Sequence, residues 1–290
     1  MIEQTNCPIC KRELKNLFTT KDYLVSKDNF DIMECPSCRL GITSPFPEKD
    51  IIGSYYESDE YISHSDQTRS LFDGVYKMVR SIMLSKKRRL VESALGRKTG
   101  KLLDMGCGTG HFLNMMKSNG WDVAGIDASI KARTFVKNQF GISVNSQTEW
   151  LNSDEKYDII TCWHSLEHVH EPWIYLEKIR MQLNTNGVLI AALPNYESTD
   201  ADKYGADWAA YDVPRHLYHF SPHSAEKIMT GNGFSIMDIR RMQFDGFYVS
   251  MLSAQHRGQS AISGLWNGLV SWVSSLLNKE KCSSLIYVMK

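Results

Sequence analysis

The stretch 101–111, with the sequence KLLDMGCGTGH, constrains this chain more than any other. A short apolar run contains Asp104 near its end, and Gly106, Gly108 and Gly110 follow at alternate positions. Glycine adopts backbone angles that other residues avoid, and it lets the chain approach a ligand where a Cβ atom would intrude. The pattern therefore predicts a buried strand, a tight ligand-binding turn and then a helix.

A second acidic residue supports this interpretation. Asp127 ends another predicted strand, 121–127, and follows Asp104 by 23 residues. A carboxylate at that place can accept hydrogen bonds from both ribose hydroxyls of a nucleoside. The alternatives are an ordinary glycine-rich turn and a nicotinamide dinucleotide site. The G-x-G-x-G spacing lacks the additional residue of the dinucleotide pattern G-x-G-x-x-G, which argues against the second.

Strands and helices alternate through the middle of the chain, which predicts an α/β fold. A parallel sheet covered by helices on both faces is the usual result of such alternation. Its ligands bind beyond the carboxyl ends of the strands. The predicted strands are 101–105, 121–127, 142–145, 157–163 and 187–193, with helices at 71–95, 111–119, 129–140, 172–184 and 222–232, and two further strands within 233–245 and 283–289.

The glycine turn with its two acids resembles the class I S-adenosylmethionine (SAM)-dependent methyltransferases, over roughly residues 72–245. The resemblance implies a Rossmann-like seven-stranded sheet whose last two strands form an antiparallel hairpin at one edge. It also implies that the first loop wraps the methionine part of SAM and that the second acid holds the ribose. The implied cofactor-binding residues are Asp104, Gly106, Cys107, Gly108, Gly110, Asp127, Ala128, Trp163 and His164.

The segment after the fourth strand, WHSLEHV at 163–169, resembles the ubiquinone-pathway O-methyltransferases, which carry Leu-Glu-His-Val here. This resemblance implies that Trp163 and His164 line the SAM pocket. Glu167 and His168 then either orient the loop or, together with His164, hold a divalent ion as in some relatives.

Four cysteines near the start of the chain form two C-P-x-C pairs. Each pair makes a tight turn that directs two thiolates to one point, and two such turns complete the tetrahedral sulfur shell that zinc prefers. A closed four-thiolate site has no open position for a substrate, so we expect a structural zinc ribbon. An iron–sulfur centre and redox thiols are the alternatives. The expected ligands are Cys7, Cys10, Cys35 and Cys38.

These features divide the chain into three predicted parts. Residues 1–45 form the zinc ribbon, 46–98 a connector with a helix, and 99–290 the SAM-binding domain with a helical insertion at about 246–282. Within the insertion, 262–277 is predicted to be a helix with one broad apolar face and one uncharged polar face. Packing against its own domain is one interpretation of that face. Peripheral membrane contact and covering of an apolar substrate are the others.

A loop after the fifth strand, residues 208–221, is rich in aromatic, histidine and arginine side chains and is our predicted substrate site. A hydroxyl acceptor needs a base, and neutral histidine suits that role near pH 7. We expect His216 first and His219 second as catalytic bases. Arg215 is expected to clamp a substrate carboxylate or phosphate, with Trp208 and Tyr211 beside it. A hydrogen-bonded loop plug is the alternative.

The composition of the chain limits the classes of partner that it is expected to bind. The chain has 33 basic and 33 acidic residues and no formal net charge, which disfavours a large nucleic-acid interface. The basic cluster 86–89 is predicted to be a solvated helix face. Neither a signal peptide nor an apolar run of membrane-spanning length is visible, so we expect a cytoplasmic protein, with association at a membrane surface as the alternative.

Three functions follow as hypotheses. The first is SAM-dependent methyl transfer, most simply to oxygen, on a small-molecule, sugar or lipid-linked acceptor. The second is an RNA methyltransferase whose zinc ribbon contacts RNA; sugar C-methyltransferases with zinc modules are a related enzyme class. The third is a non-catalytic SAM-binding or docking protein, against which the intact set of glycines and acids argues.

Overall fold

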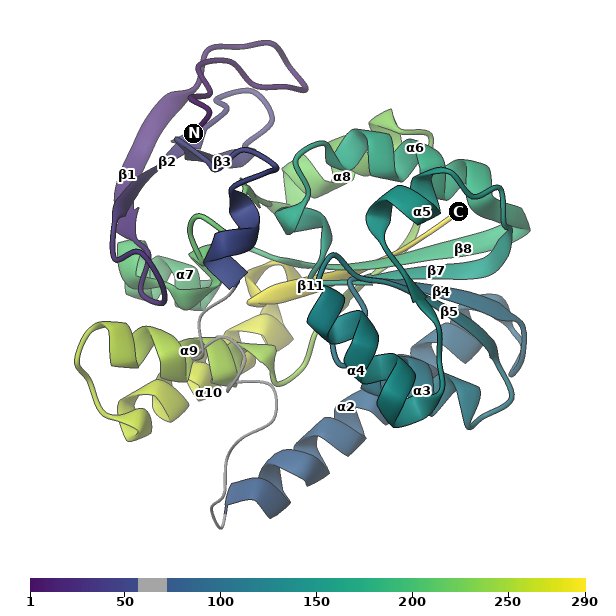
Figure 1. Cartoon of the computed structure of the whole chain (residues 1–290). Helices are drawn as coiled ribbons and strands as arrows, with labels where there is room; N and C mark the ends of the chain where they lie inside the picture. The colour runs from purple at the N-terminus through teal and green to yellow at the C-terminus, as the bar shows by residue number, and fades with distance from the viewer. Residues whose placement is uncertain (57–71) are drawn as a thin grey trace.

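The computed structural model describes residues 1–56 and 72–290. Two sheets organise the chain: a small N-terminal sheet and a larger one that runs through the middle of the molecule (Figure 1). The predicted helix start at Leu71 and the connector end at Tyr61 lie outside the described residues.

The larger sheet has seven strands in the order β10-β11-β8-β7-β4-β5-β6. Strands β4, β5, β6, β7 and β8 are parallel, whereas β11 runs antiparallel to both β8 and β10. The predicted edge hairpin is therefore present, with β10 outermost. The strands are β4 (Lys101–Met105), β5 (Asp122–Ile126), β6 (Val144–Asn145), β7 (Tyr157–Trp163), β8 (Leu183–Pro194), β10 (Ile236–Arg241) and β11 (Ser284–Met289).

Helices cover both faces of this sheet, as the alternation predicted. One apolar core joins the sheet to α5 (Gln147–Leu151), α6 (Pro172–Gln182) and α8 (Pro222–Gly231). The other core joins it to α2 (Phe72–Leu95), α3 (His111–Lys117) and α4 (Ile130–Phe140). The arrangement is the three-layer α/β/α architecture expected for a class I methyltransferase.

The N-terminal sheet has four strands in the order β1-β2-β3-β9. Three come from the predicted ribbon: β1 (Lys15–Lys21), β2 (Asn29–Glu34) and β3 (Gly41–Ser44). The fourth, β9 (Tyr218–His219), comes from the aromatic loop of the larger domain and pairs with Gly41 and Ile42. The four-stranded sheet thus contains strands of both the predicted zinc ribbon and the predicted SAM-binding domain, and it joins the two.

The predicted helical insertion consists of α9 (Asp245–His256), α10 (Ala261–Leu277) and the 3-10 turn η5 (Lys279–Lys281). These two helices pack against each other below the N-terminal sheet (Figure 1). The remaining elements are α7 (Thr199–Tyr204) and the 3-10 turns η1 (Ile52–Tyr56), η2 (Leu166–His168), η3 (Gly205–Asp207) and η4 (Ala209–Tyr211).

Most predicted element boundaries agree with the structure within about two residues. The predicted helix 172–184 is too long, because Leu183 already begins β8. The predicted strand at 187–193 accordingly starts four residues too late. Helix α7 was not predicted, since its short sequence carries no apolar periodicity.

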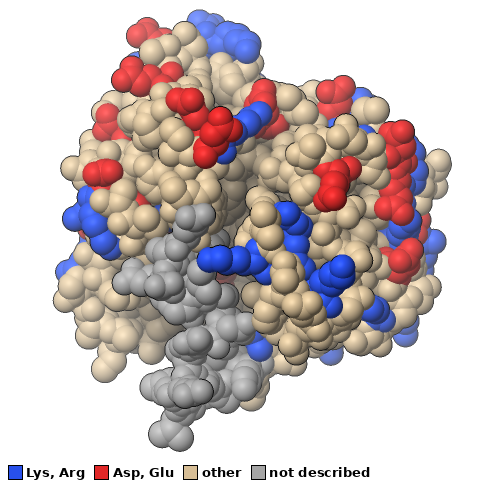
Figure 2. Space-filling view, viewed as in Figure 1, with Lys and Arg blue, Asp and Glu red and all other residues tan. Residues whose placement is uncertain are grey.

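Charged side chains of both signs are interspersed over the face shown in Figure 2, without one broad basic area. This distribution agrees with the balanced composition and gives no support to a nucleic-acid interface. Among the described residues, no helix is both long and apolar enough to cross a membrane.

Candidate active site

The glycine loop follows β4 at the carboxyl edge of the sheet, and all three of its alternating glycines have positive φ. At Gly106 an added Cβ would lie 2.7 Å from the Cβ of Ser165, and at Gly110 it would lie 2.7 Å from Val136 Cγ2. A larger residue therefore cannot fit at Gly106 without displacing the backbone around Ser165, or at Gly110 without displacing α4. At Gly108 nothing lies within 4 Å, so the loop faces open space there.

The two predicted acids lie on neighbouring strands beside this loop. Asp104 is buried and accepts a 2.6 Å hydrogen bond from Thr161, and burial raises the pKa of its carboxyl to about 7. Asp127 is half-buried. Its carboxylate accepts hydrogen bonds from the backbone N–H groups of Gly108 (2.8 Å) and Ser129 (2.9 Å). Asp127 therefore lies at the mouth of the loop, as the prediction of a ribose contact requires.

The remaining predicted cofactor residues surround the same loop. Cys107 is buried, its backbone N–H donates to the carbonyl of Ile126, and burial raises the pKa of its thiol. Ala128 is exposed at the start of α4. Trp163 ends β7, and His164 next to it has φ of +56°. The structure thus brings every predicted cofactor-binding residue to one edge of the sheet.

Lys87 on α2 also reaches this edge, although it was not among the predicted site residues. Its Nζ lies 4.4 Å from the centre of the Trp163 ring. Burial lowers the pKa of Lys87 to about 8, against the opposing influence of Asp104 and Asp245. The prediction that the cluster 86–89 is only a solvated face is therefore wrong for Lys87. Lys87 lies three or four positions from the packed residues 83, 84, 90 and 91. This helical spacing could have indicated that Lys87 lies on the packed side of α2.

Several buried polar atoms in the segment 163–167 have no hydrogen-bond partner in the described part of the chain. They are the indole N–H of Trp163, the hydroxyl of Ser165 and the carboxylate oxygen Oε2 of Glu167, whose other oxygen, Oε1, lies 3.4 Å from Nδ1 of His164. Buried polar groups in folded proteins are nearly always paired, so a cluster of unpaired ones indicates a missing ligand. These atoms fit a polar cofactor held between the glycine loop and η2.

Histidines surround the Glu167 carboxylate. His164 Nδ1 lies 3.4 Å from Glu167 Oε1, and the ligand atoms of Glu167, His168 and His216 lie within 4.8 Å of one another. Burial alone would raise the pKa of Glu167, but these three histidines hold it below its ordinary value. The pKa of His164 is raised, because Glu167 and Asp245 outweigh its burial.

His216 lies between this cluster and the aromatic loop. Its Nδ1 lies 2.9 Å from the carbonyl of Ala210, and its ring meets that of His168 edge to face at 4.5 Å. Burial, followed by the influence of His168, lowers the pKa of His216 to about 4. His168 Nδ1 in turn lies 3.0 Å from the carbonyl of Arg215 and 2.9 Å from the hydroxyl of Tyr56.

The other predicted residues of the aromatic loop are occupied by internal contacts. Arg215, 1% exposed, binds Asp212 at 2.6 Å and Asp22 of the N-terminal module at 3.0 Å. Trp208 and Tyr211 pack edge to face within an apolar cluster that includes Phe30 of β2. All three predicted substrate residues are thus buried and held by contacts within the chain. Their contact with a substrate stays a prediction.

His219 occupies a similar internal position. Its Nε2 lies 2.9 Å from the hydroxyl of Thr43 on β3, and it is 3% exposed. Burial, followed by the influence of His216, lowers its pKa to about 3. His216 lies with Glu167 and His168, whereas Nε2 of His219 is occupied by Thr43, so the geometry favours His216 over His219 for proton transfer.

The four N-terminal cysteines converge as predicted, and their sulfur atoms all lie within 4.8 Å of one another. The Sγ atoms of Cys7 and Cys38 are 3.6 Å apart, close to the roughly 3.8 Å between sulfurs of a tetrahedral zinc site. Residues Lys11 and Arg39, each directly after a cysteine pair, have positive φ and close the two turns. The cysteines are positioned to bind a metal.

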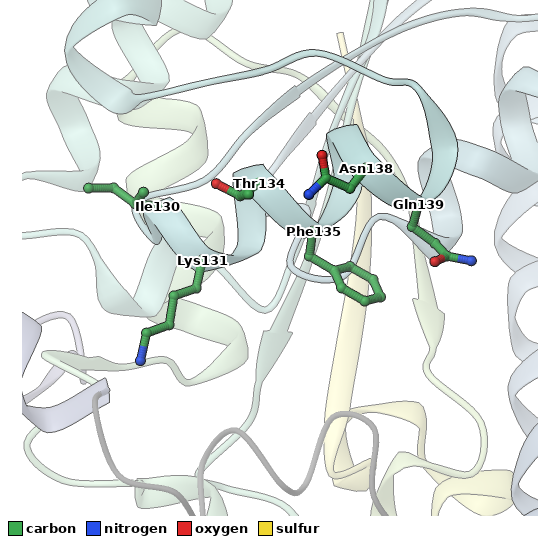
Figure 3. A pocket seen from close by; sticks show the side chains of 6 residues that line it. All are labelled: Ile130, Lys131, Thr134, Phe135, Asn138 and Gln139. Carbon is green, nitrogen blue, oxygen red and sulfur yellow. The ribbon is translucent and has the colours of Figure 1, made fainter.

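A separate depression lies along the outer face of α4 (Figure 3). All six side chains that line it come from this one helix, including Ile130, Lys131 and Phe135. None of the loop glycines or strand-end acids borders it. We therefore assign the site to the carboxyl edge of the sheet and not to this depression.

Comparison with known proteins agrees with that geometry. A family model described as "Methyltransferase domain" matches residues 79–239, more than half of the chain. The ubiquinone biosynthesis O-methyltransferase of Histophilus somni is 32% identical over 136 residues, which are 42% of this chain and 57% of that protein. The protein of the same name from Rickettsia canadensis is 26% identical over 158 residues, 50% of this chain and 66% of that protein. The chain thus spans only about 57–66% of these relatives' lengths.

Solved structures share the fold. A SAM-dependent methyltransferase from Archaeoglobus fulgidus aligns with a TM-score of 0.51 and 19% identity over 73% of this chain and 94% of its own. The magnesium protoporphyrin IX methyltransferase of Synechocystis, solved with bound SAH, aligns with a TM-score of 0.56 and 15% identity over 83% and 99%. Fold, loop geometry and family model agree, and the chain belongs to the methyltransferase domain family.

Proposed function

We propose that this protein transfers a methyl group from SAM to a hydroxyl oxygen of a small-molecule, sugar or lipid-linked acceptor. The observation that carries the proposal is the group of unpaired polar atoms beside the glycine loop: the indole N–H of Trp163, the hydroxyl of Ser165 and Oε2 of Glu167. The relatives named ubiquinone biosynthesis O-methyltransferase support oxygen as the acceptor atom. The balanced charge, and the lack of a broad basic area on the face that Figure 2 shows, disfavour RNA as the acceptor.

Residues of the glycine loop and of its surroundings would hold the cofactor. When bound, SAM supplies a sulfonium-activated methyl group. Gly106, Gly108 and Gly110 leave room for its methionine part, and Asp127 is placed to accept hydrogen bonds from the ribose. The ammonium group of Lys87 would attract the methionine carboxylate. This residue would then position the cofactor without contacting the reacting methyl group.

The acceptor proton would go to the histidine pair next to Glu167. His216 donates its Nδ1–H to the carbonyl of Ala210, which leaves Nε2 as the basic nitrogen. Proton transfer to Nε2 would leave the acceptor oxygen with the electron pair for the new bond to the methyl carbon, whose bond to the sulfonium sulfur would break with its electrons going to sulfur. The Glu167 carboxylate would stabilise the resulting imidazolium. Arg215 acts as a positioning residue, since its carbonyl orients His168 and its guanidinium fixes Asp212 and Asp22.

A divalent cation bound by Glu167, His168 and His216 is a second candidate for acceptor activation. The unpaired carboxylate oxygen Oε2 of Glu167 and the closeness of the three ligand atoms favour it. Dialysis against EDTA followed by titration with Mg²⁺ distinguishes the two. Activity that survives EDTA supports the base, whereas activity that returns only with the cation supports the metal.

We further propose that the four cysteines hold a structural Zn²⁺. Four thiolates with no open position suit zinc and offer no catalytic function. Metal analysis of the purified chain should give about one zinc per molecule by this four-ligand stoichiometry. Iron with visible absorption would contradict the proposal.

The central experiment is transfer of labelled methyl from SAM into a cell extract that is then separated into lipid, soluble small-molecule and RNA fractions. Label in the lipid or small-molecule fraction supports the proposal, and label in RNA overturns it. The variant His216→Asn should lose most turnover while binding of S-adenosylhomocysteine (SAH) stays within about twofold. His223→Asn, an exposed residue on α8, is a matched control.

A further inference from the structure

The loop that carries His216 is built against the N-terminal part of the chain as well as against the large sheet. We call residues 1–56 the N-terminal module. In the small sheet, His219 of β9 pairs with Gly41 of β3. A Cβ added at Gly41 would lie 2.9 Å from the Cβ of His219 and 3.3 Å from its carbonyl oxygen. The module and the loop are therefore in direct backbone contact.

Thr43 of β3 makes the central side-chain contact. Its side chain is buried, and its hydroxyl donates to the backbone carbonyl of His216 at 2.6 Å. The same oxygen lies 2.9 Å from Nε2 of His219. A hydroxyl has one proton, which here goes to the carbonyl, so Nε2 of His219 supplies the proton of the second bond. Thr43 thus fixes both the backbone at His216 and the tautomer of His219.

Tyr56 makes a second contact from η1, the short dark blue helix between the N-terminal sheet and the large sheet in Figure 1. Its hydroxyl lies 2.9 Å from Nδ1 of His168, which is also 3.0 Å from the carbonyl of Arg215. Because a carbonyl only accepts, Nδ1 carries the proton. The Tyr56 hydroxyl accepts from the same N–H and directs its own proton to that carbonyl, 3.5 Å away. Nε2 is then the basic nitrogen of His168.

The module also holds the residues on either side of His216. The buried carboxylate of Asp22 binds the guanidinium of Arg215 at 3.0 Å, and the backbone N–H of Thr43 donates to the carbonyl of Leu217 at 3.1 Å. Three successive residues of the loop are thus held by the N-terminal module. A base must lie within hydrogen-bond reach of the proton that it accepts, so small displacements of His216 reduce the rate.

We propose that the N-terminal module supplies two positioning residues of the acceptor site, Thr43 for His216 and Tyr56 for His168. This inference rests on the proposed role of His216 as the base. Both side chains act through a histidine and not on the acceptor itself. The module is then a working part of the methyl-transfer site, and its substitutions slow transfer without weakening cofactor binding.

Three threonine variants separate positioning from general stability. Thr43→Val keeps the shape but lacks the hydroxyl. We expect it to slow methyl transfer into the accepting extract fraction roughly tenfold or more, since a misplacement of ~1 Å can cost a hundredfold. Thr43→Ser keeps the hydroxyl and should stay within about twofold of the original rate. Thr20→Val is the matched control, because Thr20 of β1 donates across the same boundary to the carbonyl of Ala206, outside the loop, at 2.5 Å.

SAH affinity should stay within about twofold in all three threonine variants, because none of them changes the glycine loop. Equal losses of rate in Thr43→Val and Thr20→Val would show a general loss of stability and overturn the proposal. Equal losses in Thr43→Val and Thr43→Ser would overturn it as well, because the hydroxyl would then have no effect.

Tyr56→Phe tests the second contact at a half-buried position, where the loss of one hydroxyl leaves the packing of the ring in place. We expect transfer to slow roughly threefold or more, again with unchanged SAH affinity. Tyr23→Phe is its control, because the Tyr23 hydroxyl donates from the same module to Asp207 at 2.6 Å. Equal rates in the two tyrosine variants would remove Tyr56 from the proposal.

NMR of the chain labelled with ¹⁵N-histidine, without SAM or acceptor, tests the inference independently of catalysis. Near neutral pH we expect the ring proton on Nδ1 of His168 and on Nε2 of His219. Tyr56→Phe should shift the first signal and Thr43→Val the second, whereas the two control variants should shift neither.

The two measurements together separate this inference from the proposed function. Ring signals that stay unchanged in both Tyr56→Phe and Thr43→Val overturn the inference, whatever the rates. Shifted signals with a reduced rate support it. Shifted signals with an unchanged rate, together with full turnover of His216→Asn, would instead overturn the proposed base.

Discussion

The glycine loop and the aromatic loop at 208–221 both carry residues typical of binding sites, yet they have opposite surroundings. Around the glycine loop, polar atoms of Trp163, Ser165 and Glu167 lack partners within the described part of the chain, and Gly108 faces open space. In the aromatic loop, Arg215, Trp208 and His219 each have an internal partner. Residue type alone therefore does not separate a ligand site from a packed loop. The two differ in whether their buried polar atoms have hydrogen-bond partners within the protein.

Removing the Arg215 guanidinium should produce the largest change in stability. In Arg215→Met, the buried carboxylate of Asp22 loses its ion-pair partner, and we expect the free energy of unfolding to fall by about 3–5 kcal/mol. Urea unfolding measures this loss. The surface pair Arg240–Asp238 provides the control Arg240→Met, expected to cost less than about 1 kcal/mol. Undiminished stability together with lost substrate affinity would instead make Arg215 a substrate ligand.

A substitution in the glycine loop should act on binding more than on stability. Gly106→Val places a branched side chain against Ser165 at a positive φ, and we expect SAH affinity to fall by about 100-fold or more. Calorimetric titration with SAH measures it. Gly96→Ala has the same backbone strain but no neighbour within 4 Å and lies outside the loop. It should cost about 1 kcal/mol of stability and leave SAH affinity unchanged. Similar affinities for both variants would remove the loop from the cofactor site.

Asp127 tests the ribose contact with a smaller change. Asp127→Asn keeps the shape but removes the charge, and loss of charge-assisted hydrogen bonds predicts about 10- to 100-fold weaker SAH binding in the same titration. Asp122→Asn, on the exposed start of the same strand, should have no effect. If the Asp127→Asn variant binds SAH normally, the carboxylate serves only to cap the backbone N–H groups of Gly108 and Ser129.

The pH dependence of stability examines the aromatic loop. The folded-state pKa of His219, about 3, lies below the ordinary 6.5, so the unfolded chain binds its proton first as the pH falls. Stability is full above pH 6.5 and declines below it, by about 2 kcal/mol for this histidine between pH 7.5 and 5. In His219→Gln, the free energy of unfolding should fall by about 2 kcal/mol less between pH 7.5 and pH 5 than in the original chain. Urea unfolding at the two pH values measures this difference. An unchanged slope would show that His219 is not buried in a neutral state.

The α/β alternation, the edge hairpin and the convergence of four cysteines were predictable because each follows from local spacing. Strands β4 and β7 have the predicted bounds. A short apolar run before a glycine turn, or two cysteines three positions apart, leaves little conformational choice. The predicted cofactor residues come together by the same rule, since the carboxyl ends of parallel strands share one edge.

Three features could not be predicted so directly. They are the position of Lys87 at the edge of the large sheet, the fourth strand of the small sheet and the outward orientation of the apolar face of α10. Strand β9 has two residues, and its pairing with β3 joins positions more than 170 apart in the chain. In α10, both faces had a helical period, and the sequence did not say which one packs inward. The close approach of Gly264 and Gly268 to α9 decides that, and it exists only in the folded chain.

The sequence by itself determined the strand–turn–helix unit of the cofactor site and the four-cysteine cluster, because both are fixed by residues close along the chain. Only the tertiary structure decided which polar side chains remain available. Asp22 reaches Arg215 across 193 positions, so the residue that we predicted as a substrate clamp also forms an internal ion pair. Pairing of buried charges depends on which distant segments meet, and no local pattern records it.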